Sequence, residues 1–402
     1  MKMNKKVLVM LGTGHAITDI SQGALPMVLT YLQPVLILSQ LQVGIVMLAF
    51  TLSSSIVQPI FGVLSDRFRA VWLIPLGCLL AGLGMAFSGL SPNYHLLLLA
   101  GLFSGLGVAA YHPEGSKFAR FASGRRKASG MSLFSVGGNL GFAAGPILAL
   151  FFYGQAGLNG TLGFLVLNGA MAVFLWANLP VIAGNQEAKG KPVLITGRER
   201  PVEDTARANL KKMSIPILLL VLFVMIRSWI HLGLVTFLPQ YYVHYLHQSE
   251  AYAAILSTVF LFAGVFGTLA GGPAADRWGL KNVIVGSMAL LIPLLYLFIH
   301  LEGIWVTVVV ALAGFAIIST FAVTVVLAQE MMPDNVGLAS GLTLGFAIGM
   351  GGVGTTLLGW LADQWGLPAV FKLMVLFPVL GLVIAFFLPG SQELSRIQGA
   401  TD

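Results

Sequence analysis

Long apolar stretches separated by short polar ones form the dominant pattern along the chain. There are twelve such stretches, in two sets of six. Roughly 20 apolar residues are needed for a helix to cross the ~30 Å hydrocarbon core of a membrane. The pattern therefore predicts an all-α membrane protein with twelve transmembrane helices. The first set falls at about 7–33, 41–64, 71–90, 95–116, 129–153 and 161–182, and the second at about 214–239, 251–274, 282–300, 304–328, 338–361 and 368–388.

The composition agrees with a chain that lies mostly in lipid. Of the 402 residues, 57% are hydrophobic and only 9% are charged, and the mean hydropathy is +0.89. Soluble proteins carry about 25% charged residues, so soluble classes are excluded. The net charge of +7 is explained by basic loops on one side of a membrane, and we expect no nucleic-acid partner. Cys78 is the single cysteine, which excludes an intrachain disulfide.

One long polar stretch separates the two sets of apolar runs. Residues 183–213 are polar and charged and include Pro192 and Pro201, a composition typical of a linker. We therefore predict a six-helix N-terminal half at 1–182 and a cytoplasmic linker at 183–213. A second six-helix half with a short cytoplasmic tail follows at 214–402.

Lysine and arginine gather on one side of the predicted bundle. If the N-terminus is inside, nearly all of them fall in cytoplasmic segments. The exceptions are Arg227, inside a predicted helix, and Lys372, near the outer end of another. The positive-inside rule therefore predicts that both termini are cytoplasmic. The basic segment 1–6 leads straight into the first apolar run, which we expect to remain as a membrane span and not to be cleaved as a signal peptide.

The two halves repeat each other in sequence. The segment 62–67 has the same Gly-x-x-x-Asp-Arg form as 272–277, which lies 210 residues later. Ala-Ser-Gly at 128–130 recurs at 339–341, after 211 residues. Several matches at nearly the same offset indicate two related six-helix halves. Such repeats are typical of transporters in which one half rocks against the other.

The first predicted helix carries two ionisable residues at membrane depth. His15 and Asp19 are four residues apart, so a helix places both on one face. An ionisable group at that depth costs about 3 kcal/mol or more, and it normally faces a protein interior or an aqueous cavity. Because a buried aspartate can alternate between ionised and protonated forms, we predict that Asp19 and His15 take part in proton coupling. The alternative is a purely structural hydrogen-bonded pair.

A cation lies inside the seventh predicted helix. Arg227 and His231 are again four residues apart and share a face. Because arginine keeps its charge, Arg227 needs a carboxylate, a group of carbonyls or an anionic ligand. We predict a substrate-binding role for Arg227 and His231, with Gln22 and Asn139, and Asp19 competes for Arg227 if the two helices face each other. A fixed interhelical salt bridge, or snorkelling to the surface, is the alternative.

The fourth predicted helix contains His112-Pro113-Glu114 near its inner end. Proline removes a helix hydrogen bond, so we predict a kink at this point. His112 and Glu114 are further candidates for proton coupling, and Glu114 could instead pair with Arg120 in a gate, or cap or anchor the loop. The two residues are two apart and do not share a helical face. With one cysteine and scattered histidines, we expect no metal site.

The repeated loops resemble those of the major facilitator superfamily, which have the form Gly-x-x-x-Asp-Arg-x-Gly followed by basic residues. The second loop keeps Gly279 and Lys281, whereas the first has Arg69 in place of the second glycine and lacks the basic pair. A basic loop with a helix cap is the alternative to a gate. The resemblance implies a gating role for Asp66, Arg67, Asp276 and Arg277, with Arg120 beside them.

A closer resemblance, to the fosmidomycin resistance family within that superfamily, runs along nearly the whole chain. It rests on His15-x-x-x-Asp19, Gln58-Pro59, Tyr111-His112-Pro113-Glu114, Val136–Gly141 with Gly145-Pro146, Ala328-Gln329-Glu330 and the glycine-rich segment 345–352. The resemblance implies proton-driven export of a drug and a central cavity lined by the first, fourth, seventh and tenth predicted helices.

We therefore expect a proton-coupled antiporter that exports a small anionic drug-like compound such as fosmidomycin. It would act as a monomer in the lipid bilayer of the bacterial inner membrane, without a cofactor. Proton-coupled symport, importing a small organic acid, uses the same parts and stays open. An intramembrane enzyme needs a nucleophile–base pair or a metal set, and none is apparent, so we expect no enzyme. A receptor or scaffold needs neither paired halves nor several intramembrane charges.

Overall fold

The computed structural model describes residues 3–58, 60–61, 70–124, 126–187, 203–332, 339, 341–346 and 349–390. All of the regular secondary structure in these residues is helical. Each of the twelve predicted apolar runs contains helix, which confirms the all-α fold class. Seven of the described helical segments are long and apolar enough to cross a membrane by length and composition, while α2 and α4 are shorter apolar helices.

The first six runs form the helices of the N-terminal half. The short 3₁₀ segment η1 connects α6 to α7, and the short helix α8 follows α7. The bounds are α1 (Lys5–Leu36), α2 (Gln40–Ser55), α4 (Leu73–Gly89), α5 (Tyr94–Ala122), α6 (Lys127–Ala156), η1 (Gly157–Thr161), α7 (Leu162–Ala177) and α8 (Leu179–Glu187).

The second six runs form the helices of the C-terminal half. Two short π-helical segments, η2 and η4, lie among them, and the last run is divided into α16 and α17. The bounds are α9 (Glu203–Gln240), η2 (Tyr241–Tyr245), α10 (Glu250–Trp278), α11 (Leu280–Phe298), α12 (Ile304–Met331), η4 (Gly341–Phe346), α15 (Gly351–Trp365), α16 (Leu367–Met374) and α17 (Leu376–Phe386).

The helices extend into the stretch that the sequence predicts as a linker. Helix α8 continues to Glu187, and α9 begins at Glu203, well before the predicted start of the seventh run. In the sequence, Pro201 precedes this start. Residues 188–202, the centre of the predicted linker, lie outside the described part of the chain.

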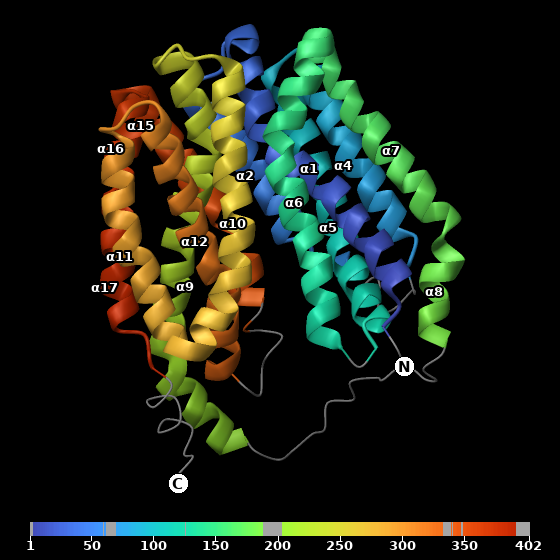
Figure 1. The fold of residues 1–402 in the computed structure, drawn as a ribbon, viewed down its shortest axis with the longest axis vertical. Helices are drawn as coiled ribbons and strands as arrows, with labels where there is room; N and C mark the ends of the chain where they lie inside the picture. Colours follow the sequence, from blue (N-terminus) through green and yellow to red (C-terminus); the bar gives the residue numbers. More distant parts are fainter. Residues whose placement is uncertain are drawn as a thin grey trace.

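Figure 1 shows the helices in two groups side by side, α1 to α8 in one and α9 to α17 in the other. Within the first group α1 packs along α6, and within the second α10 packs along α12. Glycines permit the close approach of α1 and α6, because a side chain at Gly137 would overlap the Gly12 carbonyl and one at Gly141 would overlap the Ala16 carbonyl. The groups meet through α2 with α15 and α6 with α10.

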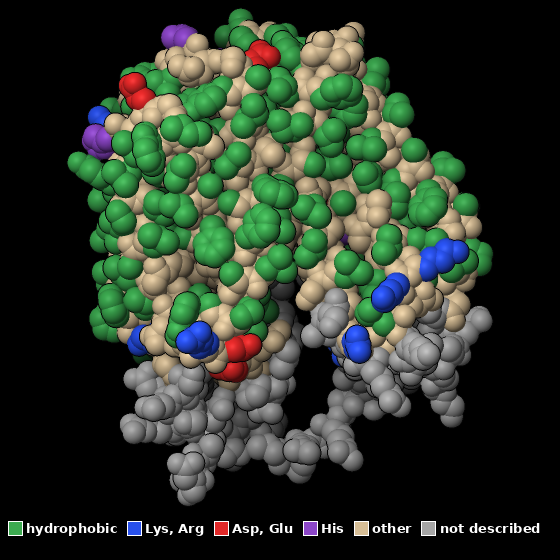
Figure 2. Space-filling view, in the orientation of Figure 1, with side chains coloured by type: hydrophobic (Ala, Val, Ile, Leu, Met, Phe, Trp, Pro, Cys, Tyr) green, Lys and Arg blue, Asp and Glu red, His purple; other side chains and the backbone are tan. Residues whose placement is uncertain are grey.

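The two ends of the bundle differ in charge. We call the end where α1 begins at Lys5 the near end, and the end where α1 stops at Leu36 and α2 starts at Gln40 the far end. The start of α1 and the end of α17, the first and last helices described, both lie at the near end (Figure 1). Figure 2 shows hydrophobic side chains over most of one face, with nearly all of its visible lysine and arginine side chains toward the near end. This distribution is typical of a protein embedded in a bilayer.

Candidate functional site

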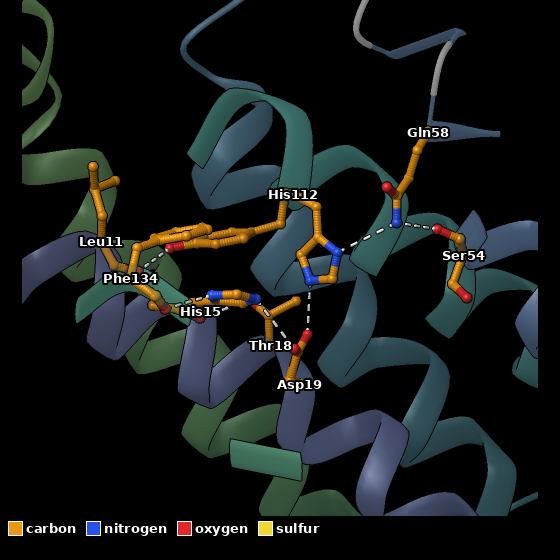
Figure 3. Close-up of polar contacts among 10 residues, drawn as sticks. Leu11, His15, Thr18, Asp19, Ser54, Gln58, His112 and Phe134 are labelled. Atoms are coloured by element: carbon orange, nitrogen blue, oxygen red, sulfur yellow. Dashed lines mark hydrogen bonds and ion pairs between the residues drawn. The ribbon is translucent and has the colours of Figure 1, made fainter. Parts of the chain in front are cut away.

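His15 and Asp19 meet on one face of α1, as their four-residue spacing predicts. His15 Nε2 lies 3.2 Å from Asp19 Oδ2 (Figure 3). The side chains are only 12% and 11% exposed, so little water reaches the pair. At such low exposure an ionic contact is screened less than at a surface. The pair is therefore a buried, ionisable contact within one helix.

His112 of α5 contacts the other oxygen of the same carboxylate. Its Nε2 lies 2.8 Å from Asp19 Oδ1 (Figure 3). Helix α5 continues through Pro113 to Ala122, so the proline lies inside the helix and does not end it. Each carboxylate oxygen of Asp19 thus faces one imidazole. We call His15, Asp19 and His112 the His–Asp–His cluster.

The contact of His15 Nδ1 shows that this ring nitrogen carries a hydrogen. His15 Nδ1 lies 2.8 Å from the Phe134 carbonyl oxygen, and the Phe134 ring stacks on the imidazole with ring centres 4.2 Å apart. A carbonyl oxygen can only accept a hydrogen bond, so Nδ1 must carry a hydrogen. His15 Nε2 therefore carries a second hydrogen only when the ring is a cation.

With Nδ1 as a donor, the contact between His15 Nε2 and Asp19 Oδ2 has room for one hydrogen. With this proton present, the pair is either an imidazolium with a carboxylate or a neutral imidazole with a carboxylic acid, and both are attractive. Without it, a nitrogen lone pair faces a carboxylate oxygen at 3.2 Å, and this contact is repulsive. Proton release therefore weakens the contact between the two side chains.

Neighbouring residues leave the cluster little free space. The Tyr111 hydroxyl donates to the Leu11 carbonyl oxygen at 2.6 Å and closes one side. On the side of α6, Gly138 lies so close that a side chain there would overlap the His15 ring and the Asp19 carboxylate. This close packing restricts the movement of the His15 and Asp19 side chains and so maintains the contact between them.

The cluster is also the group of described residues whose atoms could surround a metal ion. Its three ligand atoms lie within 4.8 Å of one another. Two imidazoles and one carboxylate suit zinc and related ions. However, both imidazole Nε2 atoms already lie at hydrogen-bond or ion-pair distance from Asp19. If His112 Nε2 carries a hydrogen, this nitrogen donates to Asp19 and cannot bind a metal ion.

Arg227 of α9 is buried against α12. It is 1% exposed, and its Nη1 donates to Thr324 Oγ1 at 3.0 Å and to the Thr320 carbonyl oxygen at 3.3 Å. Its guanidinium carbon lies 3.9 Å from the centre of the Phe321 ring. Arg227 Nε has no hydrogen-bond partner among the described residues. These contacts solvate the charge but do not neutralise it.

Asp19 and Arg227 are therefore engaged separately in this conformation. Asp19 contacts two histidines, and Arg227 contacts α12. The direct pairing that the sequence suggests for facing helices is not formed, although α1 and α9 do touch. The physical reason is that each group already has partners at hydrogen-bond distance on a nearer helix.

His231 lies one turn after Arg227 and connects this region to the N-terminal half. It is buried, and its Nε2 has no hydrogen-bond partner in the described part of the chain. Its ring is 5.3 Å from Phe321 and 6.0 Å from Phe142 of α6, measured between ring centres. Phe142 and Gly138 are four residues apart, so one face of α6 touches both His231 and the His–Asp–His cluster.

The remaining residues predicted for the site make none of the contacts described above for the His–Asp–His cluster and Arg227. Gln22 and Asn139 are partly exposed, on α1 and α6. Glu114 is buried, and its carboxylate lies 3.6 Å from Lys117 Nζ, whereas Arg120 is exposed. In this conformation Glu114 therefore contacts Lys117 of its own helix, and its predicted pairing with Arg120 in a gate stays a prediction.

The predicted gating residues are described in only one of the two loops. Asp276 and Arg277 are both exposed at the end of α10. Asp66 and Arg67 lie outside the described residues.

Several residues of the site have no role in the sequence-based predictions. Phe134 and Gly138 shape the cluster, while Phe321 and Thr324 hold Arg227. Gln58 contacts His112 and enters the sequence argument only through the family resemblance. The sequence does contain one indication of the Arg227 contacts, because Thr320 and Thr324 place two hydroxyls on one face of an apolar helix.

Comparisons with known proteins agree with this architecture. The model of the Major Facilitator Superfamily matches residues 11–245 and 217–401. The fosmidomycin resistance protein of Escherichia coli is 32% identical over 96% of this chain and 93% of its own. A transporter of Bacillus subtilis, described as an uncharacterised member of the superfamily, is 31% identical over 96% of this chain and 94% of its own.

Solved structures give the same result for the fold. A bacterial homologue of the human lysosomal transporter Spinster superposes with a TM-score of 0.77 at 16% identity, over 98% of both chains. The nucleoside transporter NupG superposes with a TM-score of 0.73 at 14% identity, over 95% of this chain and 98% of its own. The prediction of a transporter and not an enzyme is confirmed. The chain is a multi-pass membrane protein that belongs to the major facilitator superfamily.

Proposed function

We propose that this transporter is a proton-coupled antiporter that exports a small anionic drug-like compound, such as fosmidomycin, across the bacterial inner membrane. It works as a monomer, and the near end, with both termini, faces the cytoplasm. Similarity to the fosmidomycin resistance protein of Escherichia coli supports the substrate class. The gathering of lysine and arginine toward the near end supports the orientation.

The observation that supports the proton coupling is the buried contact of His15 Nε2 with Asp19 Oδ2, in a histidine whose Nδ1 already contacts the Phe134 carbonyl oxygen. While the proton is bound, Asp19 is held by two imidazoles. After release, the contact between Asp19 and His15 is repulsive, and the carboxylate is freed from one of its two partners. Proton binding and release thus change the contacts of α1 with its surroundings. Such a change is what a proton-driven carrier needs in order to favour one conformation over another.

Arg227 supplies the positive charge for the anionic substrate. Its guanidinium is buried beside Phe321, and its Nε is unused among the described residues. A phosphonate or carboxylate can take two hydrogen bonds from one guanidinium group, which favours arginine over lysine at such a site. His231, one turn away with an unused Nε2, offers a further polar contact.

Proton movement in proteoliposomes tests the proposal. Fosmidomycin is added to purified, reconstituted protein with a pH-sensitive dye inside the vesicles. Antiport predicts that protons and substrate move in opposite directions, and symport of an organic acid predicts the same direction. Asp19→Asn should abolish proton-driven accumulation while sparing exchange of internal for external substrate. The control Glu302→Gln removes an exposed carboxylate and should behave as the wild type. Accumulation by Asp19→Asn at the wild-type level would reject the assignment of Asp19.

A further inference from the structure

Gln58 touches the His–Asp–His cluster from outside it. Gln58 Nε2 lies 2.6 Å from the Ser54 carbonyl oxygen and 3.3 Å from His112 Nδ1 (Figure 3). Gln58 follows the end of α2, so this contact joins the region of α2 to the cluster on α1 and α5. His112 therefore has two polar neighbours, Asp19 on Nε2 and Gln58 on Nδ1.

The Ser54 carbonyl fixes the orientation of the Gln58 amide. If the amide were turned by 180°, its oxygen would face the carbonyl oxygen at 2.6 Å with no hydrogen between them. That arrangement is repulsive, so the nitrogen must face Ser54. An amide nitrogen only donates, and its second hydrogen points to His112 Nδ1. His112 Nδ1 is consequently an acceptor and carries no hydrogen.

The position of the hydrogen on His112 follows from this contact. A neutral imidazole without a hydrogen on Nδ1 carries it on Nε2, which lies 2.8 Å from Asp19 Oδ1. His112 is thus a neutral donor to Asp19. A proton added at Nδ1 would face the NH₂ group of Gln58, so this geometry opposes the cationic form. It also opposes a metal ion on Nε2, because that nitrogen has no free lone pair.

The two histidines of the cluster therefore differ in kind. His15 donates its Nδ1 hydrogen to the Phe134 carbonyl oxygen, and no amide group fixes the state of its Nε2, which faces Asp19. His112 is held in one neutral form by Gln58. Among the described residues, the ionisable groups that face His112 are Asp19 and His15 of α1 and Tyr111 of its own helix. The His112 ring centre lies 4.8 Å from that of His15 and 6.4 Å from that of Tyr111.

We propose that Gln58 is a positioning residue that holds His112 as a neutral donor to Asp19, so that the only exchangeable proton of the cluster is the one between His15 and Asp19. The inference rests on the proposed function only where that proton is called the coupling proton. It also gives Gln58 a consequence for transport: without it the cluster takes up a second proton, and the ratio of protons to substrate changes.

Nitrogen-15 NMR of histidine-labelled, purified protein tests the assignment, with His112→Asn used to identify the His112 signals. In the wild type, His112 should show one protonated nitrogen, Nε2, and should keep this form as the pH is varied around neutrality. Gln58→Glu places an acceptor opposite Nδ1, so His112 should become cationic at neutral pH. Gln58→Met, of similar length without the amide, should let His112 exchange between tautomers.

The control is Ser54→Ala, which keeps the carbonyl that orients Gln58 and should leave the His112 signals unchanged. A hydrogen on His112 Nδ1 in the wild type, or unchanged His112 signals in both Gln58 variants, would overturn the proposal. The NMR signals do not depend on transport. If they follow the expected pattern while proteoliposomes show no proton movement, the role of Gln58 stands and the antiport mechanism fails.

Discussion

The carboxylate of Asp363, at the end of α15, caps the first turn of α2 in the opposite half. Its Oδ1 accepts from the Gln40 backbone N–H at 2.7 Å, and its Oδ2 accepts from that of Leu41 at 2.9 Å. The first N–H groups of a helix have no partner within the helix and carry partial positive charge. Asp363 therefore joins the two halves of the transporter at the far end.

Close packing brings Asp363 to this position. Gly359, one turn earlier on α15, lies so near the Gln40 carbonyl that a side chain would overlap it. A second contact between the halves lies at the same end, where His244 Nε2 is 2.9 Å from the Thr30 carbonyl oxygen. The halves are thus held together at the far end in this conformation, and these contacts must break before that end can open.

Replacing Asp363 should make opening of the far end easier. Asp363→Ala removes both acceptors from α2, and an anion at a helix N-terminus stabilises by about 0.3–1 kcal/mol. We expect the ratio of open to closed molecules at the far end to rise roughly two- to fivefold. Spin labels on cysteines at Ile37 and Trp365, both exposed, report the distance between the halves in a Cys78→Ala background.

The control for this experiment is the adjacent substitution Gln364→Ala, at an exposed position on the same helix. It should leave the distance distribution of the labelled protein unchanged. A distribution for Asp363→Ala identical to that of the control would mean that the cap does not hold the halves together.

Adding a methyl group at Gly138 should separate His15 from Asp19. The overlapping atoms are all in the side chains of these two residues, so the backbone of α6 need not move. We expect Gly138→Ala to fold and to bind substrate, while the dependence of transport on a pH gradient is largely lost. Gly154→Ala is the matched control, because Gly154 lies on α6 with open space around it. Wild-type pH dependence in Gly138→Ala would show that the close His15–Asp19 contact is not required.

Substitutions of Arg227 should weaken substrate binding in a defined order. Arg227→Lys keeps the charge but loses the forked geometry, and we expect roughly tenfold weaker binding of fosmidomycin, since a charged hydrogen bond contributes about 1.5–3 kcal/mol. Arg227→Gln should weaken binding further. Equilibrium binding to purified protein measures both, with Lys372→Gln, an exposed lysine at the far end, as control. Equal affinity of wild type and Arg227→Gln would leave Arg227 as a structural residue of the α9–α12 contact.

The orientation in the membrane can be tested by labelling from one side. Cysteines replace Arg126, between α5 and α6, and Glu302, between α11 and α12, one at a time in a Cys78→Ala background. Both residues are exposed, and they lie at opposite ends of the bundle. A membrane-impermeant reagent added to intact cells should label Glu302→Cys and leave Arg126→Cys unlabelled. The reverse pattern would invert the proposed orientation.

Much of the architecture was predictable because it depends on local sequence. Apolar runs long enough to cross a bilayer became helices, and the spacing of His15 and Asp19 correctly places them on one face of α1. Each of these features follows from residues within one helix.

The partners across helices were not predictable from spacing. The approach of His112 to Asp19 depends on how α5 is rotated against α1, and that rotation is set by packing of whole helices. The same reason explains why Arg227 faces α12 and not Asp19. The early start of α9 at Glu203 does not follow from hydropathy, because the first residues of this helix are polar and lie before the apolar run.

One face of α6 contacts both the His–Asp–His cluster and the surroundings of Arg227, and it can therefore couple proton binding to substrate binding. Gly138 borders His15 and Asp19, and Phe142, four residues later, borders His231 beside Arg227. If occupancy near Arg227 changes proton affinity at Asp19 through this face, then protonation must change substrate affinity by the same factor, since the cycle of binding steps has to close. The substrate-induced shift in proton uptake and the pH-induced shift in substrate affinity are therefore one quantity, and either measurement gives the other.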